Sequence, residues 1–516
     1  MAADRDRFRI ELDVDAGLAR QPRPAPPRQQ NEPAVGAFRI ALIGDFSGRA
    51  SRGVVQTGKD IARRRPVRVD RDTLDDAVAR LAPTLALRFG TSDEDSAITF
   101  SSLDDFHPDR LYDRLPRFRA LRDALALADA STELTRSVGT GGPPTTLATP
   151  SGILDAILGA APAPPGGEAL ARTPSGATLQ TRNDGGLSEF VQKALAPHLV
   201  ASPDPSQAER RAQVDAAITS EMRALLHHPH FQALEAMWRG VAEVVRRLDT
   251  DANLQLYLID VSRDELAADL AAGIEASGFY RLLVDGSVGM PGTPAWAVLA
   301  GLFSLGGDEA ELSLLAGLGA IAGDARAPFV AGASPLLAGA TSIAASPDPD
   351  DWIEATPRGW TALRASTVGS HIGLALPRIL LRMPYGERTD ACELFAFEEF
   401  APGIRPEHDS YLWGSGSLAV ALLLGEAFSE TGWTLRPGHE ISGLPLHVYR
   451  DDGEVVATPC AEIVLSERIA ARLQDRGLTP VLSVRDTGGV VVPVLRSIAD
   501  PPARLAGRWT SNADGD

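Results

Sequence analysis

The sequence predicts an α/β protein, or more loosely an α+β protein, in which mixed sheets are covered by helices. Segments with strand and helix patterns alternate through residues 254–333, and such alternation is typical of a sheet with helices on its faces. An apolar stripe at three- and four-residue spacing runs from Phe231 to Leu248 and predicts one long covering helix. In order, the alternating segments are LQLYLIDVS, RDELAADLAA, GFYRLLVDG, PAWAVLAGLFSL, EAELSLLAGLGAIAG and APFVAGA.

Residues 1–17 contain a strand pattern that has no partner nearby in the sequence. Apolar side chains alternate with Arg9, Glu11 and Asp13, which is the two-residue period of a strand. The Pro-rich segment 18–36 that follows predicts an extended linker. An unpaired strand exposes N–H and C=O groups, so we expect another chain to complete its sheet. The apolar residues of this pattern are Phe8, Ile10, Leu12 and Val14.

Residues 37–136 form the first predicted domain. The run FRIALIGDF (38–46) predicts a buried strand, and the apolar spacing of 74–81 predicts a short helix. Residues 98–101 alternate between apolar and polar, which predicts a half-buried strand. Pro108 then suits the first turn of a helix, since that position needs no N–H donor.

Residues 137–186 predict a flexible joint, because they are rich in Gly, Pro, Ala and Thr. Within the joint, SGILDAILGA (151–160) places four apolar residues on one face of a two-turn helix. So short a helix is marginal alone, which fits a segment that folds on a partner, a helix docked on this protein's own surface or an accidental apolar cluster. Residues 187–195 are a second candidate for the same role. The four residues are Ile153, Leu154, Ile157 and Leu158.

Residues 187–498 form the second predicted domain, and 499–516 a C-terminal tail. RDDG (450–453) predicts a hairpin turn, and 466–477 predicts a capped helix closed by glycine. Two strands then flank a Thr-Gly-Gly turn. The second of these strands is the last one predicted, as residues 8–14 are the first. Its residues are Val490, Val491, Val492, Val494 and Leu495.

Composition and charge exclude several classes of partner. The net charge is −18, and residues 187–516 hold 43 acidic against 25 basic groups while residues 1–186 hold 25 of each. An acidic surface repels phosphate backbones, so we expect no nucleic acid partner. No run reaches the roughly 18–20 apolar residues of a membrane helix, and MAADRDRFRI has charges where a signal peptide is apolar. We therefore expect a cytoplasmic protein without direct membrane insertion.

The sequence offers little support for catalysis, a metal or a cofactor. His227, His228 and His230 are the metal candidates, but Pro229 predicts a helix start there, and we favour capping and packing. Neither a GxSxG elbow, a GxGxxG loop nor a GxxxxGK[ST] loop occurs. Cys392 and Cys460 are expected to be small buried hydrophobes. We expect no enzyme, although a soluble metal-dependent hydrolase using the histidine cluster stays a remote alternative.

Two sets of blocks carry a resemblance to a known family. GDFSGR (44–49), RRRPVRVDRDTLDDAVARLAP (63–83) and ITFSSLDDFHPDRLYDRLPRF (98–118) resemble the small subunit of the contractile sheath of the bacterial type VI secretion system. The second half resembles the large sheath subunit, in the family's order. Its blocks are HHPHFQALEAMWRG, APFVAGASP, HIGLALPRILLRMPYG, FAFEEF, YLWGSGSLAVALLLGEAF and GLPLHVYRDDGEVVATPCAEIVLSER.

This resemblance implies a natural fusion of two subunits that are usually separate chains. It implies a homopolymer around an inner tube protein, attached to baseplate components, whose contraction drives the tube outward. The donated strands would be residues 8–14 and 490–495. A Clp-type AAA+ ATPase that recycles contracted sheaths would grip residues 153–158. The sheath of a related phage-tail-like injection particle is the open alternative.

Overall fold

The computed structural model describes residues 36–87, 96–123, 205–288, 294–353, 355–401, 403–464 and 466–509. The chain divides into two compact units. The larger combines Met1–Leu111 with Arg223–Asp516, and the smaller is Tyr112–Met222.

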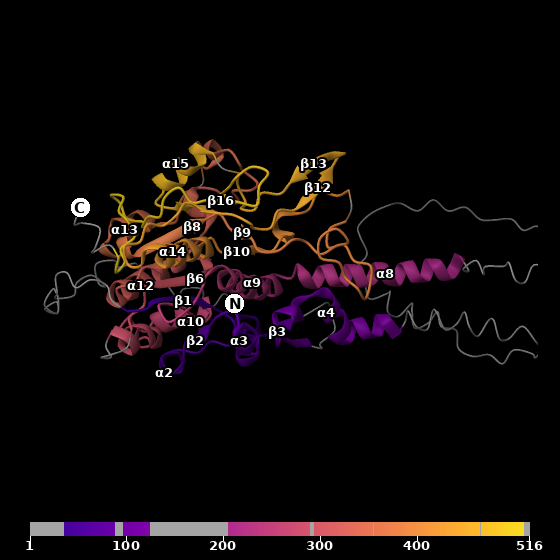
Figure 1. Ribbon diagram of the computed structural model, residues 1–516, viewed down its shortest axis with the longest axis horizontal. Coiled ribbons are helices and arrows are strands. Elements are labelled where there is room, and N and C mark those ends of the chain that lie inside the picture. The colour runs from indigo at the N-terminus through magenta and orange to yellow at the C-terminus, as the bar shows by residue number, and fades with distance from the viewer. Residues whose placement is uncertain are drawn as a thin grey trace, which may run out of the picture. The chain divides into compact units, whose positions relative to one another are not determined.

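A seven-stranded sheet forms the centre of the larger unit (Figure 1). All neighbouring strands in it are parallel except β2, which pairs antiparallel with β5 at one edge. Two of its strands come from the first half of the sequence, and one of these is central. The order is β14 (Thr479–Pro480), β8 (Ile372–Leu376), β7 (Phe329–Ala333), β6 (Val298–Leu305), β1 (Phe38–Gly44), β5 (Leu254–Asp260) and β2 (Val67–Val69).

β1 lies between β5 and β6, and all seven of its residues are buried. Its register pairs Phe38 with Leu254 on one side and Ile40 with Val298 on the other. A strand that is covered on both faces reads as a continuous apolar run, which explains the sequence FRIALIG. The predicted domains 37–136 and 187–498 therefore share one sheet.

Helices cover both faces of this sheet. Ala41 and Ile43 of β1 belong to the core cluster that includes α12 (Glu309–Ala325). Successive side chains of a strand point to opposite faces, and Phe38 accordingly stacks on Phe428 of α14 (Ser417–Thr431) at a centroid separation of 4.6 Å. Helix α9 (Pro229–Arg247) packs on α14. Their approach is close, because a Cβ on Gly240 would lie 2.7 Å from Leu418 Cδ1.

The remaining elements belong to the larger unit, except for the last residues of α4 and most of α8, which belong to the smaller one. From the first half these are η1 (Ala50–Arg52), α2 (Lys59–Ala62), α3 (Leu74–Leu81), β3 (Thr84–Leu87), β4 (Ser96–Thr99), η2 (Leu103–Phe106) and α4 (Pro108–Arg114). From the second half they are α8 (Pro205–Leu226), α10 (Arg263–Leu270), α11 (Gly278–Tyr280), the π-helical η3 (Arg281–Val288), η4 (Pro335–Ala338), η5 (Pro349–Asp351), α13 (Trp360–Ala365), η6 (Thr367–His371), β9 (Ile379–Leu380), η7 (His408–Ser410), β10 (Trp413–Gly414), β11 (Glu440–Ile441), β12 (Val448–Asp451), β13 (Glu454–Ala457), α15 (Glu467–Asp475), β15 (Leu482–Ser483) and β16 (Val490–Val491).

The smaller unit is helical in its described part. It consists of residues 112–123 and most of α8. Phe118 and Ile218 are buried, and Arg117 pairs with Glu221 at 2.8 Å.

Most elements expected from the sequence are present. The strand β4 with buried Ile98 and the helix α4 beginning at Pro108 are confirmed, as are α9 and the β12–β13 hairpin. The strict alternation through 254–333 is wrong at one point: GFYRLLVDG is helical, and PAWAVLAGLFSL supplies the strand β6. The physical reason is that Phe279, Leu283 and Val284 share one helix face, on which all three are buried.

No helix in the described part of the chain combines the length and apolar character that crossing a membrane requires.

Candidate functional site

Three buried acidic residues of the second half hold the segment 47–64 of the first half. Asp260 is the last residue of β5, and Glu265 and Asp269 follow on α10. A spacing of four residues places the two helical carboxylates on the same face. All three residues are less than 10% exposed. We call Asp260, Glu265 and Asp269 the carboxylate ladder.

Asp260 binds the loop that follows β1. Its Oδ1 accepts a hydrogen bond from the Ser47 N–H at 3.0 Å, and its Oδ2 pairs with Arg49 Nη1 at 2.7 Å. β1 and β5 are adjacent and in register, so their carboxyl ends lie side by side. The ladder thus begins where the two halves share backbone hydrogen bonds.

Glu265 makes a two-pronged contact with Arg64. Arg64 Nη2 lies 2.6 Å from Oε1, and Arg64 Nη1 lies 2.9 Å from Oε2. The carboxylate also accepts hydrogen bonds from the backbone N–H groups of Gln56 and Ser262. Bidentate arginine–carboxylate pairs combine charge with fixed geometry, which makes them strong and specific.

Asp269 accepts three backbone N–H groups from both halves. These belong to Gly58 at 2.6 Å, Gly278 at 3.0 Å and Phe279 at 2.9 Å. The two glycines meet directly, because a Cβ built on Gly278 would lie 1.9 Å from the Gly58 carbonyl oxygen. No side chain fits there, so α2 and α11 pack backbone to backbone.

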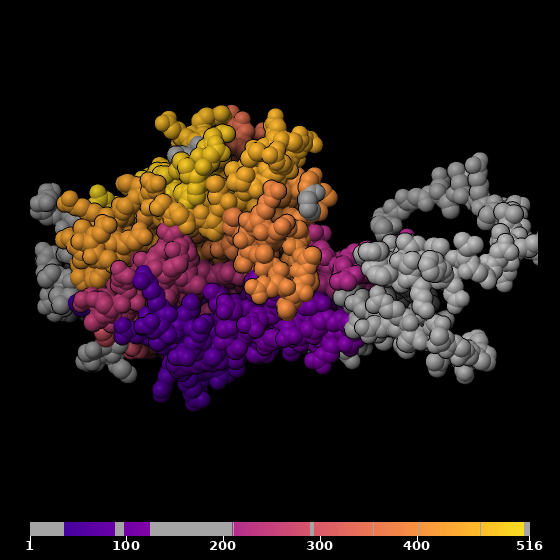
Figure 2. All heavy atoms as spheres, turned by 45° about the vertical axis from the view of Figure 1, so that its right-hand side comes forward, coloured from indigo at the N-terminus to yellow at the C-terminus, as the bar shows by residue number. Residues whose placement is uncertain are grey.

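The ladder stabilises the interface because each buried carboxylate is paired. An ionised carboxylate is costly to bury without a partner. Burial by itself would raise the pKa of Glu265, but the hydrogen bonds from Arg64 and the Ser262 N–H lower it below its usual value. Figure 2 shows residues of the first half packed against the second half within the larger unit. The sequence predicted the helix RDELAADLAA but not the contact that Glu265 and Asp269 make with the first half. A solvated acidic helix face has the same residue spacing.

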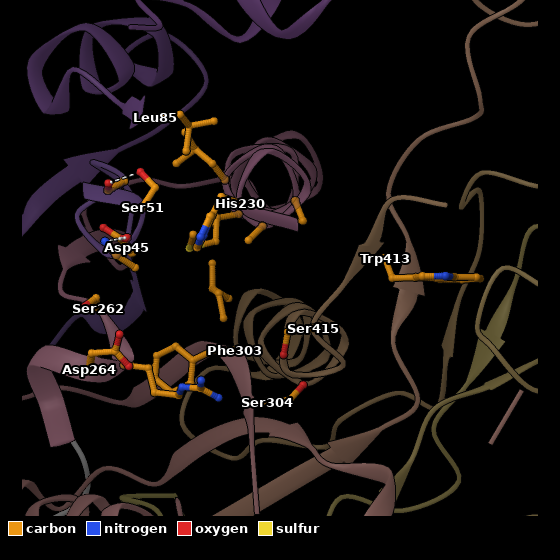
Figure 3. A pocket seen from close by; sticks show the side chains of 18 of the residues that line it. Asp45, Ser51, Leu85, His230, Ser262, Asp264, Phe303, Ser304, Trp413 and Ser415 are labelled. Atoms are coloured by element: carbon orange, nitrogen blue, oxygen red, sulfur yellow. Dashed lines mark hydrogen bonds between the residues drawn. The ribbon is translucent and has the colours of Figure 1, made fainter. Parts of the chain in front are cut away.

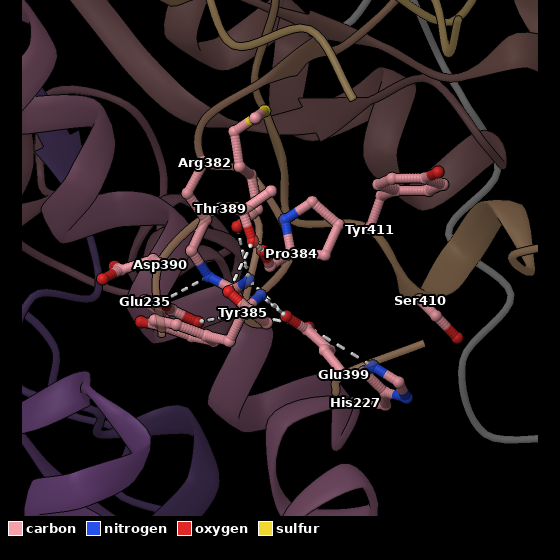
Figure 4. Close-up of polar contacts among 12 residues, drawn as sticks. His227, Glu235, Arg382, Pro384, Tyr385, Thr389, Asp390, Glu399, Ser410 and Tyr411 are labelled. Atoms are coloured by element: carbon pink, nitrogen blue, oxygen red, sulfur yellow. Dashed lines mark hydrogen bonds and ion pairs between the residues drawn. The ribbon is translucent and has the colours of Figure 1, made fainter. Parts of the chain in front are cut away.

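A second buried ionic cluster lies within the second half (Figure 4). Arg382 follows β9 and pairs with Glu235 of α9 at 2.9 Å and with Glu399 at 2.6 Å. Arg239 contacts the same Glu235 at 2.6 Å and donates to the Tyr385 hydroxyl at 2.7 Å. The cluster fixes the loops around residues 382–399 against α9.

Two carboxylates of the second half have strongly lowered pKa values. Burial opposes ionisation of Glu399, but the charge of Arg382 and hydrogen bonds from His227, Arg382 and the Tyr385 N–H lower its pKa to about 2. Glu462 behaves alike: burial is outweighed by His408 and Arg378, which lower its pKa to about 2. Both groups therefore stay ionised in the folded chain down to strongly acidic pH.

The histidine cluster serves the helix junction, as expected. His228 is the N-cap of α9, and its Nδ1 accepts from the His230 N–H at 3.2 Å. His227 Nε2 lies 3.4 Å from Glu399 and its ring stacks on Phe400. Glu399 is an ion-pair partner of Arg382, and Asp105 forms a capping box with Ser102.

A cavity of about 390 Å³ opens at the carboxyl ends of the central strands (Figure 3). Asp45 follows β1, Ser262 follows β5 and Ser304 lies near the end of β6, while His230 of α9 faces them. Ligands of α/β sheets often bind at this edge. Here the Asp45 carboxylate accepts from the N–H groups of Arg49 and Ala50, so it closes a turn.

The β12–β13 hairpin contrasts with the closed sheet. It forms a two-stranded sheet of its own, and the described residues place no third strand on either edge. Val448 is 52% exposed and Val455 is 66% exposed. Figure 1 shows the hairpin at the periphery, away from β1 and β6. Isolated hairpins are marginally stable in water, and open apolar edges favour pairing with another chain.

The structure describes only some of the sequence-predicted site residues. Phe8, Ile10, Leu12 and Val14 lie outside the described residues, as do Ile153, Leu154, Ile157, Leu158 and the alternative 187–195. Val490 and Val491 form β16, the middle strand of a three-stranded sheet between β11 and β15. Both edges of β16 are therefore occupied within the chain, and Val492 beyond it is buried. Donation of 490–495 to a neighbour stays a prediction.

The cysteines differ from each other. Cys460 is buried as expected, whereas Cys392 is half-buried and lies with His107 and Asp109. His107 and Asp109 are far from Cys392 in the chain, so no local spacing in the sequence indicates that the three residues lie together.

Comparisons with known proteins agree for both halves. The VipB family model, which describes the EvpB tail sheath N-terminal domain, matches residues 208–498, more than half of the chain. The VipA family model of the type VI secretion system matches residues 29–139. The type VI secretion system sheath protein TssC1 of Pseudomonas aeruginosa is 33% identical over 317 residues. That match covers 59% of this chain and 63% of the relative's length.

Proposed function

The chain belongs to the family of type VI secretion sheath proteins and carries the domains of both sheath subunits, and we propose that it is a fused structural subunit that polymerises into a contractile sheath. Polymerisation would take place around an inner tube, and contraction would propel that tube. Contraction energy would be stored in contacts between protomers.

The observation that carries this proposal is the position of β1. The VipA-matching region supplies a strand between two strands of the VipB-matching region. The ladder then adds buried ion pairs across the same junction. These contacts support the proposal that one chain is a complete sheath protomer and needs no separate small subunit.

We propose that the β12–β13 hairpin accepts the N-terminal strand of a neighbouring protomer. Among the described residues no strand pairs with either edge of the hairpin, which also has exposed valines, and the sequence of residues 8–14 has an alternating apolar pattern. Strand addition satisfies backbone groups on both partners. The linker 18–36 would allow protomers to move without breaking this pairing.

Further partners follow from the family and stay proposals. They are an inner tube protein, baseplate components and a Clp-type ATPase that grips Ile153, Leu154, Ile157 and Leu158 on contracted sheaths. The proposed location is the cytoplasm. The sheath of a related contractile particle would use the same polymer, and the neighbouring genes distinguish the two.

Electron microscopy of the purified chain tests the central proposal, with long hollow tubes as the expected result. Deletion of residues 1–17 should abolish tubes while leaving the circular dichroism spectrum and the melting temperature unchanged. Scrambling the order of residues 20–35, as the matched control, should leave tubes intact. Normal tubes from the deletion variant would refute strand donation, and dispersed particles from the full chain under all salt conditions would refute the sheath itself.

A further inference from the structure

Three potential metal ligands converge where the first half meets a loop of the second half. One ligand atom each from His107, Asp109 and Cys392 lies within 4.8 Å of the others. All three residues are half-buried, so an ion from solvent can reach them. The loop that carries Cys392 also carries Glu399 of the buried ionic cluster.

We propose that His107, Asp109 and Cys392 bind a single Zn²⁺ ion. Imidazole, carboxylate and thiolate are all Zn²⁺ ligands, and this mixture favours Zn²⁺ over Mg²⁺ or Ca²⁺ because those ions prefer oxygen. Zinc bonds of about 2.0–2.3 Å at tetrahedral angles hold ligand atoms roughly 3.3–3.6 Å apart. The observed 3.7 Å between His107 Nδ1 and the Asp109 carboxylate is close to that spacing and too long for a direct hydrogen bond.

The surrounding groups orient these ligands. His107 Nε2 lies 3.6 Å from the Asp390 carboxylate, so coordination through Nδ1 leaves the other ring nitrogen facing an acceptor. The second nitrogen of a metal-bound histidine almost always donates to a carboxylate, a backbone carbonyl or water. The metal would replace the hydrogen bond of 3.2 Å that the Asp109 N–H donates to Nδ1.

Asp109 is likewise held in place. Its two oxygens accept the N–H groups of Glu393 at 2.8 Å and Leu394 at 3.1 Å, which leaves each oxygen a second lone pair. These bonds fix the carboxylate next to the loop that bears Cys392. A bound cation would also offset the negative charges of Asp109 and Asp390, whose carboxylates lie 3.7 Å and 3.6 Å from the two ring nitrogens of His107.

The ion would add a metal link between the two halves, apart from the shared sheet and the carboxylate ladder. His107 and Asp109 belong to the VipA-matching region, and Cys392 belongs to the VipB-matching region. Metal binding would connect the start of α4 to the loop that contains Cys392 and Glu399. The inference concerns the protomer alone, so it stands whether or not the chain forms a sheath.

Metal binding to the full-length chain tests the proposal. After removal of metals, titration with Co²⁺ should give one equivalent per chain with a thiolate-to-cobalt charge-transfer band, and Zn²⁺ should displace it. The variant Cys392→Ser should lose the band. Asp109→Asn and Asp390→Asn should each weaken Co²⁺ binding by tenfold or more, in line with losses at ligands and their supporting partners. The exposed neighbour Glu393→Gln is the matched control and should bind as the wild type does.

A second measurement avoids any folding defect of the variants. Zn²⁺ added to the wild-type chain should slow alkylation of Cys392 by at least tenfold, with the modified peptide identified by mass spectrometry, while the rate at Cys460 stays unchanged. The absence of a charge-transfer band, a band that survives Cys392→Ser, or Cys392 alkylation that Zn²⁺ does not slow would overturn the assignment. Co²⁺ bound at the histidine cluster instead would give no thiolate band. Loss of metal binding in His228→Gln would therefore also overturn the assignment.

Discussion

Strand β1 and the β12–β13 hairpin show two opposite ways of completing a sheet. β1 comes from the first half of the chain and lies between β5 and β6, with all its residues buried. The hairpin comes from the second half, has no described third strand and exposes Val448 and Val455. The backbone and apolar side chains of β1 are satisfied within the chain, whereas the described residues leave the hairpin edges unpaired and these two valines exposed.

The difference separates folding from assembly. A strand in the middle of a parallel sheet cannot leave without exposing both neighbours, so we expect β1 to be required for the fold. An open hairpin costs the protomer little and offers a template for another strand. We therefore expect changes near β1 to act on stability, and changes on the hairpin to act on association.

Division of the chain should have the largest effect. If residues 1–186 and 187–516 are expressed separately, each should be insoluble or unfolded, since the second piece lacks the strand between β5 and β6. Expressed together, with a tag on one piece, they should purify as a stoichiometric complex. A soluble and cooperatively melting second piece alone would show that the shared sheet is not essential.

Removal of a charge from the ladder should come next. Arg64→Ala leaves Arg49 at 3.9 Å as the one charged partner of buried Glu265 among the described residues, which should cost about 3 kcal/mol of unfolding free energy. Arg65→Ala, the exposed neighbour, should cost less than about 0.5 kcal/mol. Denaturant unfolding of both variants measures the difference, and equal losses would argue against the ladder.

Acid should destabilise the second half through Glu399 and Glu462. Their folded pKa values of about 2 lie below the usual value of 4.5, so their stabilisation is complete above pH 4.5 and is lost as the pH falls towards 2. The loss should be on the order of 2–3 kcal/mol for each group. Glu399→Gln should flatten this pH dependence, as measured by melting temperature. A wild-type stability that stays constant from pH 5 to pH 2.5 would contradict the assignment.

The contact between Gly58 and Gly278 should have a smaller effect. Gly278→Ala places a methyl group against the Gly58 carbonyl, and the required backbone shift should cost about 1–3 kcal/mol. Gly438→Ala is the matched control, because a Cβ there would meet nothing within 4 Å. Thermal unfolding distinguishes the two, and indistinguishable melting temperatures would mean that the close packing is easily relieved.

The hairpin should give the smallest change in stability and a large change in association. Val455→Lys replaces an exposed valine, so the unfolding free energy should stay within about 0.5 kcal/mol of the wild type. The same change should prevent tube formation, since a charge on the open strand blocks edge pairing. If Val455→Lys destabilised the protomer, the hairpin would contribute to folding as β1 does, which would contradict the distinction between the two regions.

The sequence predicted the class of fold and several local elements correctly. A continuous apolar run, a Pro at the start of α4 and an Asp-Gly turn each act over a few residues, so β1, α4 and the hairpin could be recognised without a structure. The error at GFYRLLVDG arose because a short apolar run is compatible with both a strand and a buried helix. Its periodicity alone does not distinguish the two.

The sequence by itself determined that this chain carries two family regions, that its centre is an α/β sheet and that its excess negative charge belongs to the second half. Only the tertiary structure decided that β1 enters the sheet of the other half, that Glu265 and Asp269 are interface residues, and that His107 meets Cys392. The physical reason is that strand order and burial depend on contacts between residues far apart in the chain, whereas a local pattern does not distinguish a buried acidic helix face from a solvated one.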